Sequence, residues 1–353
     1  MELKGVLADA TERDWETEPP EAPLSLAVIG LGVFGRKVAL PALERAESAE
    51  ASVVVSGSAE KAAEVGGQYG ATGLTYDQYH DGEASEEYEA VYVATPNATH
   101  LDFADTAAEL GKHVICEKPL EATAARAERL VEATESAGVR LMTAYRMQTT
   151  PIVRRARELV AHGAIGQPVR AEGSFNTKPL TGRSPDQWRL DGELAGGGAL
   201  PDIGIYPLNT ARFVLDAEPA TVRGYVASPD APFEDVDEHV AFTLGFDEGL
   251  HVTGHASFNA EPESRLRVVG TEGILDIEPI FHVQATRTLS LRRGDEDVSV
   301  TTSTDEVTAE FEYFAHAVRT DEPIEPDGAD GLADMRLIQA IYESAETGSV
   351  VSL

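Results

Sequence analysis

A glycine-rich turn near the N-terminus is the first feature of the sequence that could do chemistry. Residues 30–35 read Gly-Leu-Gly-Val-Phe-Gly, after the apolar run 26–29 and before a helix-like segment at 37–46. Such glycines permit a tight turn and let the backbone approach a pyrophosphate at the helix N-terminus. A plain glycine turn is the alternative, but a strand, a helix and a second strand surround this one, so the pattern predicts a dinucleotide site. The residues assigned to this site are Gly30, Gly32, Val33, Phe34, Gly35 and Arg36.

The end of the second strand-like run, residues 52–55, indicates which dinucleotide binds. NAD enzymes usually place an acid about 20 residues after the glycine turn, where it binds the ribose 2′-hydroxyl. This chain has Ser56, Gly57 and Ser58 there, with Lys61 one turn into the next helix. Two hydroxyls and an ammonium would attract a 2′-phosphate that an acid would repel, so the window favours NADP. The alternative is a capped helix with a solvated Lys61.

A charged pair and a proline follow the strand-like run 113–116, in the order Glu117, Lys118, Pro119. Open α/β sheets bind ligands at the carboxyl ends of their strands. Proline biases Lys118 toward an extended conformation and makes the Lys118–Pro119 bond a candidate for the cis form. The alternative is a surface salt bridge followed by a turn. Cys116, the only cysteine, is expected to pack as a small apolar residue and not to act as a nucleophile.

A third pattern combines three glycines with a helix that carries a carboxylate and a phenol. Residues 196–206 read Gly-Gly-Gly-Ala-Leu-Pro-Asp-Ile-Gly-Ile-Tyr. The glycines would let the backbone pass close to a ligand, and Asp202 and Tyr206, four residues apart, would share one helix face. Together they could hold and deprotonate a sugar hydroxyl. The alternative is that Asp202 only caps the helix and Tyr206 only packs.

The three motifs, in this order, resemble the glucose–fructose oxidoreductase and inositol dehydrogenase family (Gfo/Idh/MocA). The resemblance covers roughly residues 24–350, and Glu117-Lys118-Pro119 is the most specific short motif. It implies catalytic roles for Lys118 and Tyr206 and a substrate contact for Asp202. Many relatives carry histidine in place of Tyr206, so the tyrosine places this chain on the aldose-oxidising side of the family.

The resemblance also implies a reaction and further cofactor contacts. Tyr206 would take the C1-hydroxyl proton of a cyclic aldose, with D-xylose as the first candidate, while hydride leaves C1 for NADP and a lactone forms. The positive charge of Lys118 would favour the phenolate. His100 has either a structural or a cofactor-adjacent role. The residues matched to the cofactor site are Thr95, Pro96, Asn97, His100, Glu117, Arg146, Trp188 and Arg189.

Two other functions remain open at this point. One is dismutation of the glucose–fructose oxidoreductase type, or oxidation of another aldose. The other is a non-catalytic NADP-binding sensor, against which the complete set of Lys118, Asp202 and Tyr206 argues. A short N-terminal arm without an export signal argues against a cofactor that is never released.

These residues require elements that place them at strand ends and at a helix start. Alternating strand-like and helix-like runs predict a Rossmann domain over residues 24–148, preceded by an acidic, extended arm at 1–23. Longer alternating strands predict an α+β domain over 149–353 with an open, mostly antiparallel sheet. The C-terminal helix or strand is a candidate to return to the first domain.

The composition limits the partners. The 61 acidic residues outweigh the 28 basic ones, which gives a formal charge of −33, spread along the whole chain. Such a charge repels nucleic acid and suits concentrated salt, where repulsion is screened. The single cysteine and the lack of a long apolar run predict a cytoplasmic protein without membrane contact. We expect a small sugar as substrate, a homo-oligomer of two or four copies, and no metal, because His251 and His255 lie in a strand-like run.

Overall fold

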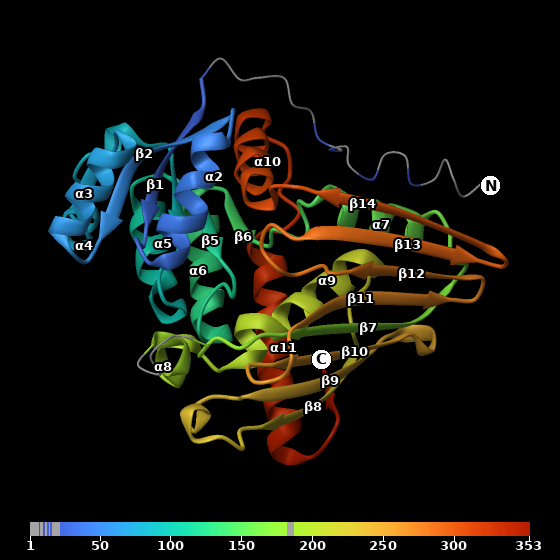
Figure 1. Ribbon diagram of the computed structural model, residues 1–353. Helices are drawn as coiled ribbons and strands as arrows, with labels where there is room; N and C mark the ends of the chain where they lie inside the picture. Colours follow the sequence, from blue (N-terminus) through green and yellow to red (C-terminus); the bar gives the residue numbers. More distant parts are fainter. Residues whose placement is uncertain (1–6, 8–9, 11–12, 14, 16–21, 182–186) are drawn as a thin grey trace. The chain divides into compact units, whose positions relative to one another are not determined.

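The computed structural model describes residues 7, 10, 13, 15, 22–181 and 187–353. The chain forms two compact units (Figure 1). The first, here called the α/β unit, comprises Trp15–Arg146 and Asp305–Met335. The second, the mixed-sheet unit, comprises chiefly Met147–Thr304 and Arg336–Leu353. The predicted boundary at residue 148 therefore lies close to the observed one, but residues 149–353 do not form one domain, because Asp305–Met335 belongs to the α/β unit.

The α/β unit contains a six-stranded sheet in the order β3-β2-β1-β4-β5-β6, with every pair of strands parallel. This is the strand order of a doubly wound dinucleotide-binding fold, so the predicted Rossmann domain is confirmed. All four residues of β4 are buried, as expected for a central parallel strand. The strands are β1 (Leu24–Ile29), β2 (Ala49–Ser56), β3 (Thr72–Thr75), β4 (Ala90–Val93), β5 (His113–Glu117) and β6 (Leu141–Ala144).

The helix after the glycine turn begins irregularly. A π-helical turn, Gly35–Ala39, leads into α2 (Leu40–Arg45), where a single helix-like segment at 37–46 was predicted. Pro41 has no N–H to offer the carbonyl of Lys37, and a wider turn accommodates the missing hydrogen bond. The unit's other helices are α3 (Ala59–Tyr69), α4 (Tyr76–His80), α5 (His100–Glu109), α6 (Ala124–Ala137) and α10 (Glu306–Thr320).

Buried aromatic surface explains why α10 belongs to this unit. Phe311 and Phe314 are fully buried in the same apolar core as β1 and β4, and the Phe311 ring lies 5.0 Å from the Tyr92 ring. The Trp15 ring packs edge-on against Tyr313, with centroids 5.1 Å apart. Most of the predicted N-terminal arm lies outside the described residues. Trp15, however, is buried, although the arm showed no apolar periodicity.

The described part of the mixed-sheet unit contains nine strands in the order β14-β13-β12-β11-β7-β10-β9-β8-β15. Among them only the β7–β10 pair is parallel, so the predicted mostly antiparallel sheet is confirmed. The strands are β7 (Pro168–Asn176), β8 (Thr221–Ala227), β9 (His239–Gly245), β10 (His251–Ser257), β11 (Glu263–Gly270), β12 (Gly273–Glu278), β13 (Thr286–Arg293), β14 (Glu296–Ser303) and β15 (Val351–Ser352).

One helix of this unit packs on the sheet and carries the predicted acid/base residue. Helix α9 (Ile205–Leu215) is buried over nearly its whole length. A Cβ at Gly173 of β7 would overlap Pro207 of α9, so this glycine lets the helix approach the sheet closely. The other helices are α7 (Pro151–Ala161), α8 (Gly192–Ala195) and α11 (Gly328–Thr347), which continues from the α/β unit. Within the described part of the chain, no helix is long and apolar enough to cross a membrane.

Candidate active site

The glycine turn has the geometry that a bound pyrophosphate requires. Gly30 has φ +103°, and a Cβ there would overlap the carbonyl of Ala94. A Cβ at Gly35 would overlap the carbonyl of Gly30, so the first and third glycines are fixed by packing. Around Gly32 there is no heavy atom within 4 Å of an added Cβ, and the neighbouring Val33 is exposed. The backbone is therefore accessible at the position where a phosphate would approach.

The β2–α3 turn contains hydroxyls in two different environments. Ser56 is only 4% exposed, and its Oγ accepts a hydrogen bond from the backbone N of Ser58 at 3.2 Å. The exposed Ser58 caps α3, since its Oγ accepts from the backbone N of Lys61 at 3.3 Å. The capped-helix alternative is thus present. It is compatible with binding a 2′-phosphate, because Ser58 remains accessible and no carboxylate occupies the turn.

Tyr76 is a neighbour of this turn that sequence reasoning missed. Its ring would lie 3.1 Å from a Cβ added at Gly57, so it covers one side of the turn. Burial raises the pKa of Tyr76, and a hydrogen bond with the Gly57 backbone opposes that shift. Tyr76 directly follows β3, a four-residue strand in which only Leu74 is buried. The sequence of β3 therefore contains no apolar run from which the strand could have been predicted.

His100 connects two loops at the carboxyl edge of the sheet. Its Nε2 lies 3.0 Å from the carbonyl of Thr95, and its Nδ1 lies 3.3 Å from the carbonyl of Leu120. Burial lowers the pKa of His100, and these two carbonyls oppose the shift. The ring is 0% exposed, so of the two roles left open the geometry favours the structural one. The neighbouring Thr95 and Asn97 are also buried.

The Glu-Lys-Pro motif ends β5, and the Lys118–Pro119 bond is cis. Glu117 accepts a hydrogen bond from the Tyr92 hydroxyl at 2.6 Å and another from the backbone N of Lys118 at 3.2 Å. The Lys118 side chain is half-buried at the strand's carboxyl end. Burial raises the pKa of the Cys116 thiol well above its usual value, which supports packing and not nucleophilic attack.

Two buried acidic side chains near this motif were not predicted as site residues from the sequence. Glu306 and Glu310, both on α10, are buried, and Glu306 Oε1 lies 3.5 Å from a guanidinium nitrogen of the buried Arg146. Burial, then the charge of Glu117, raises the pKa of Glu310 well above its usual value, while Arg146 opposes the shift. Arg146 was predicted to contact the cofactor. The structure shows it compensating buried carboxylates.

In the mixed-sheet unit, three of the predicted site residues lie together. The Arg189 guanidinium stacks over the Trp188 ring at 4.5 Å, and its Nε lies 3.5 Å from Asp202 Oδ2. Asp202 belongs to a π-helical turn, Leu200–Gly204, that leads into α9. Arg189 thus links the Trp188 ring to the carboxylate predicted to contact substrate.

Tyr206 sits in an aromatic cluster at the start of α9. Its ring lies 5.4 Å from the Phe175 ring and 5.7 Å from the Phe281 ring, measured between centroids. Edge-on and tilted contacts of this kind fix the ring by packing, independently of the hydroxyl. Neither phenylalanine was singled out from the sequence, since each is one more apolar residue in an alternating strand or a loop.

The glycines before α9 serve a different purpose from the one expected. A Cβ at Gly197 would overlap the Tyr342 hydroxyl, and a Cβ at Gly198 would overlap the backbone carbonyl of Asp237. The close approach that these two glycines allow is therefore to the protein itself. The prediction that they open space for a ligand is wrong for Gly197 and Gly198.

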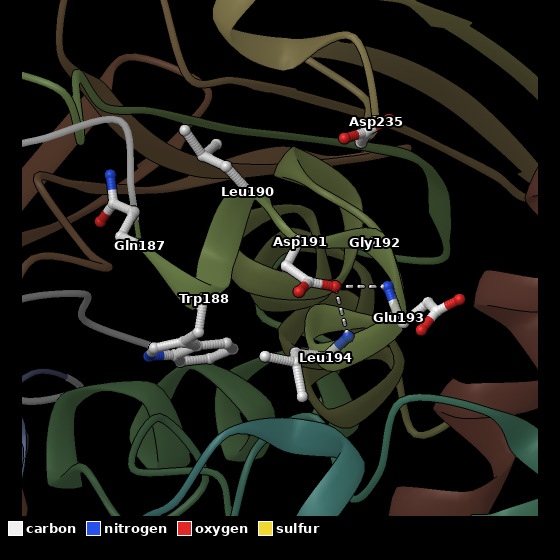
Figure 2. Close-up of a pocket in the computed structure, with 8 residues that line it drawn as sticks. All are labelled: Gln187, Trp188, Leu190, Asp191, Gly192, Glu193, Leu194 and Asp235. Atoms are coloured by element: carbon white, nitrogen blue, oxygen red, sulfur yellow. Dashed lines mark hydrogen bonds between the residues drawn. The ribbon is translucent and has the colours of Figure 1, made fainter.

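A pocket of about 740 Å³ opens in the mixed-sheet unit beside Trp188 (Figure 2). Asp191 is one of the residues that line it, and one of its carboxylate oxygens accepts hydrogen bonds from the backbone N of Glu193 at 3.0 Å and of Leu194 at 3.1 Å. Its acidic lining is unfavourable for phosphate. The described residues that line it are Gln187, Trp188, Leu190, Asp191, Gly192, Glu193, Leu194 and Asp235.

Comparison with known protein families gives a match for each half of the chain. Residues 24–145 match the family described as oxidoreductase family, NAD-binding Rossmann fold, and residues 153–276 match the GFO/IDH/MocA C-terminal domain. The chain belongs to the GFO/IDH/MocA oxidoreductase family. The resemblance stated from the three motifs is thereby confirmed.

Individual known proteins are similar to this chain over 94% or more of its length. A D-xylose 1-dehydrogenase [NADP(+)] of Haloarcula marismortui is 45% identical and is aligned over 100% of both chains. A D-xylose 1-dehydrogenase (NADP(+)) of Haloferax volcanii is 34% identical over 94% of this chain and 100% of its own. Among solved structures, the aldose–aldose oxidoreductase of Caulobacter crescentus complexed with glycerol has a TM-score of 0.88 and 31% identity, and covers 94% of this chain and 100% of its own.

Proposed function

We propose that this protein is an NADP-dependent dehydrogenase that oxidises an aldose, with D-xylose as the first candidate, at C1 to the aldonolactone. The observation that carries the proposal is the 45% identity, over the entire chain, to a D-xylose 1-dehydrogenase [NADP(+)]. The second relative of this name, at 34% identity, points to the same substrate and cofactor. The presence of Lys118, Asp202 and Tyr206 together argues against a sensor without catalysis.

In this proposal the α/β unit binds the cofactor. The accessible backbone at Gly32 suits the pyrophosphate, and the N–H groups that begin the following helix carry partial positive charge. Ser58 and Lys61 supply a hydroxyl and an ammonium for the 2′-phosphate. NADP⁺, when bound, accepts the hydride from C1 of the sugar.

Tyr206 and Lys118 are the residues proposed for proton transfer. Tyr206 acts as the general base that removes the proton from the C1 hydroxyl as the carbon–hydrogen bond at C1 breaks, and C1 becomes the carbonyl carbon of the lactone. The resemblance to the family assigns a supporting catalytic role to Lys118. Asp202, held by Arg189 at 3.5 Å, orients a sugar hydroxyl. One aldose and one NADP⁺ thus give one lactone, one NADPH and one proton.

Initial rates with a panel of pentoses and hexoses, with NADP or NAD, at molar KCl, test this proposal. We expect D-xylose with NADP to give the highest kcat/KM, and stoichiometric lactone and NADPH. No turnover of any aldose with NADP would contradict it, as would an equal rate with NAD.

A second function is favoured by one observation, the similarity to an aldose–aldose oxidoreductase at TM-score 0.88. Such an enzyme would reduce a second sugar with the hydride taken from the first. The same assay separates the two functions. A dehydrogenase releases NADPH in proportion to lactone, whereas a dismutase forms lactone and a sugar alcohol without net NADPH.

A further inference from the structure

The helix that carries the substrate-side residues begins without a cap of its own. The first N–H groups of a helix have no acceptor within the helix and must find one elsewhere when they are buried. Gly198, Ala199 and Leu200, at this start, are buried, and Ala199, at the cap position, has no side chain that could accept a hydrogen bond from these N–H groups. Ser, Thr, Asp and Asn, the usual capping residues, are missing from residues 196–200.

Asp237, from the loop before β9, supplies the missing acceptors. Its Oδ1 accepts from the backbone N of Gly198 at 2.6 Å, and its Oδ2 accepts from that of Leu200 at 2.7 Å. Its own carbonyl accepts from the backbone N of Ala199 at 2.8 Å. One residue, 6% exposed and 37 positions distant from Leu200, therefore satisfies three consecutive N–H groups.

Tyr342 of α11 completes this arrangement. Its hydroxyl donates to Asp237 Oδ1 at 2.5 Å, so both carboxylate oxygens face donors. Burial and the charge of Asp237 raise the pKa of Tyr342 well above its usual value, which keeps its hydroxyl protonated as a donor. Burial raises the pKa of Asp237, and the Tyr342 hydroxyl and the two backbone donors oppose that shift. Because all three partners are donors, the ionised carboxylate fits this environment.

We propose that Asp237, held by Tyr342, is a positioning residue for aldose oxidation, fixing the start of the helix that bears Asp202 and Tyr206. Asp202 lies two residues beyond Leu200, and its backbone N donates to the carbonyl of Gly198 at 3.2 Å, so the register of the turn is set at the residues Asp237 holds. The inference rests on the roles proposed above for Asp202 and Tyr206. Gly197 and Gly198 are required because a side chain at either would displace the pair.

Tyr342→Phe and Asp237→Asn test the inference in the full-length protein at molar KCl. Tyr342→Phe removes one donor, whereas Asp237→Asn replaces one acceptor by an NH₂ group that opposes the N–H or O–H facing it. A misplacement of about 1 Å can cost about 100-fold, so we expect kcat to fall about tenfold and about 100-fold, respectively. The Kd of NADP should stay unchanged. The double variant should have the kcat of Asp237→Asn alone, because Tyr342 acts through Asp237.

Two matched controls separate positioning from loss of stability. Asp305→Asn alters another carboxylate that caps a helix, since Asp305 accepts from the backbone N of Thr308 at 3.2 Å. Tyr79→Phe removes another buried phenol, which donates to the carbonyl of Phe103 at 2.9 Å. Both should lower Tm and leave kcat unchanged.

The outcomes are distinct. If Tyr342→Phe and Asp237→Asn lower only Tm, as the controls do, Asp237 is a structural cap and the inference is overturned. Should Asp237→Asn fail to fold, the kcat of Tyr342→Phe decides by itself. Failure of the proposed function appears separately, as a wild-type protein without aldose turnover or as a Tyr206→Phe variant that retains it.

Discussion

Tyr206 is the residue assigned to proton transfer, and its surroundings allow that role to be isolated. The ring is held by Phe175 and Phe281, so Tyr206→Phe removes the hydroxyl and keeps the packing. General base catalysis is typically worth roughly 10²–10⁴-fold, and we expect kcat to fall by about that factor while the Kd of NADP is unchanged. Lys118→Ala should lose a comparable factor, and the double variant little more. Aldose oxidation by Tyr206→Phe within a few-fold of wild type would falsify the assignment.

Glu310 leads to a pH prediction. Its pKa is raised by burial and by Glu117, so the folded protein holds a proton that the unfolded chain releases above its ordinary pKa. The free energy of unfolding therefore falls as pH rises from about 4.5 toward the folded pKa, with a slope of about 1.4 kcal/mol per pH unit. Glu310→Gln mimics the protonated acid and therefore removes the contribution of Glu310 to this pH dependence. We expect the variant to gain stability relative to wild type between pH 5 and pH 8.

Denaturant unfolding of both proteins across this pH range measures the effect. The charged and titratable groups that influence Glu310 are Glu117, Arg146 and Glu306. Glu306→Gln is a suitable comparison, because it removes a buried carboxylate of the same helix that lies against Arg146 and should lower stability instead of raising it. Parallel stability curves for wild type and Glu310→Gln would show that Glu310 is ionised in the folded protein.

The β2–α3 turn is the element on which cofactor preference depends. Ser58→Asp keeps the cap of α3, since aspartate is a good N-cap, and places a carboxylate in the turn. A repulsion of about 1.4 kcal/mol corresponds to a factor of ten, so the KM for NADP should rise by about tenfold. Ser58→Asn keeps the cap without the charge and is the control. If both variants raise the KM equally, the hydroxyl matters and the charge does not.

The elements also show which features a sequence can reveal. Strands β1, β2 and β5 carry apolar runs because both faces of the sheet are covered there, and they were predicted from that signal. Strand β14 has no buried residue, so it lacks an apolar pattern and was not predicted. The glycine turn and the Glu-Lys-Pro motif are local in sequence. Asp237 and Glu310 interact with residues that are distant in the sequence. Only the tertiary structure brings these groups together, so neither role could be predicted from the sequence.

At the scale of the whole molecule, net charge is the property with the largest expected effect. The formal charge is −33, so most carboxylates cannot be paired with a basic side chain. Some pairs that do form, such as Arg45–Asp305 at 2.6 Å, lie at partly exposed positions and contribute little each. Repulsion among the remaining carboxylates therefore opposes folding, and its range depends on the salt concentration.

We expect Tm to fall steeply when KCl is lowered from molar to millimolar concentration. The screening length is about 3 Å at 1 M and about 30 Å at 0.01 M, so at low salt each carboxylate is repelled by many others. Replacing KCl by sorbitol at equal osmolality should not restore Tm, because sorbitol does not screen charge. Glu132→Gln/Glu135→Gln, which neutralises two exposed acids on α6, should reduce the loss at low salt and change Tm little at molar salt. A Tm that is insensitive to KCl would rule out charge repulsion as the main force opposing folding at low salt. If sorbitol restored Tm as well as KCl does, the effect would be due to exclusion of the cosolvent from the protein surface and not to charge screening.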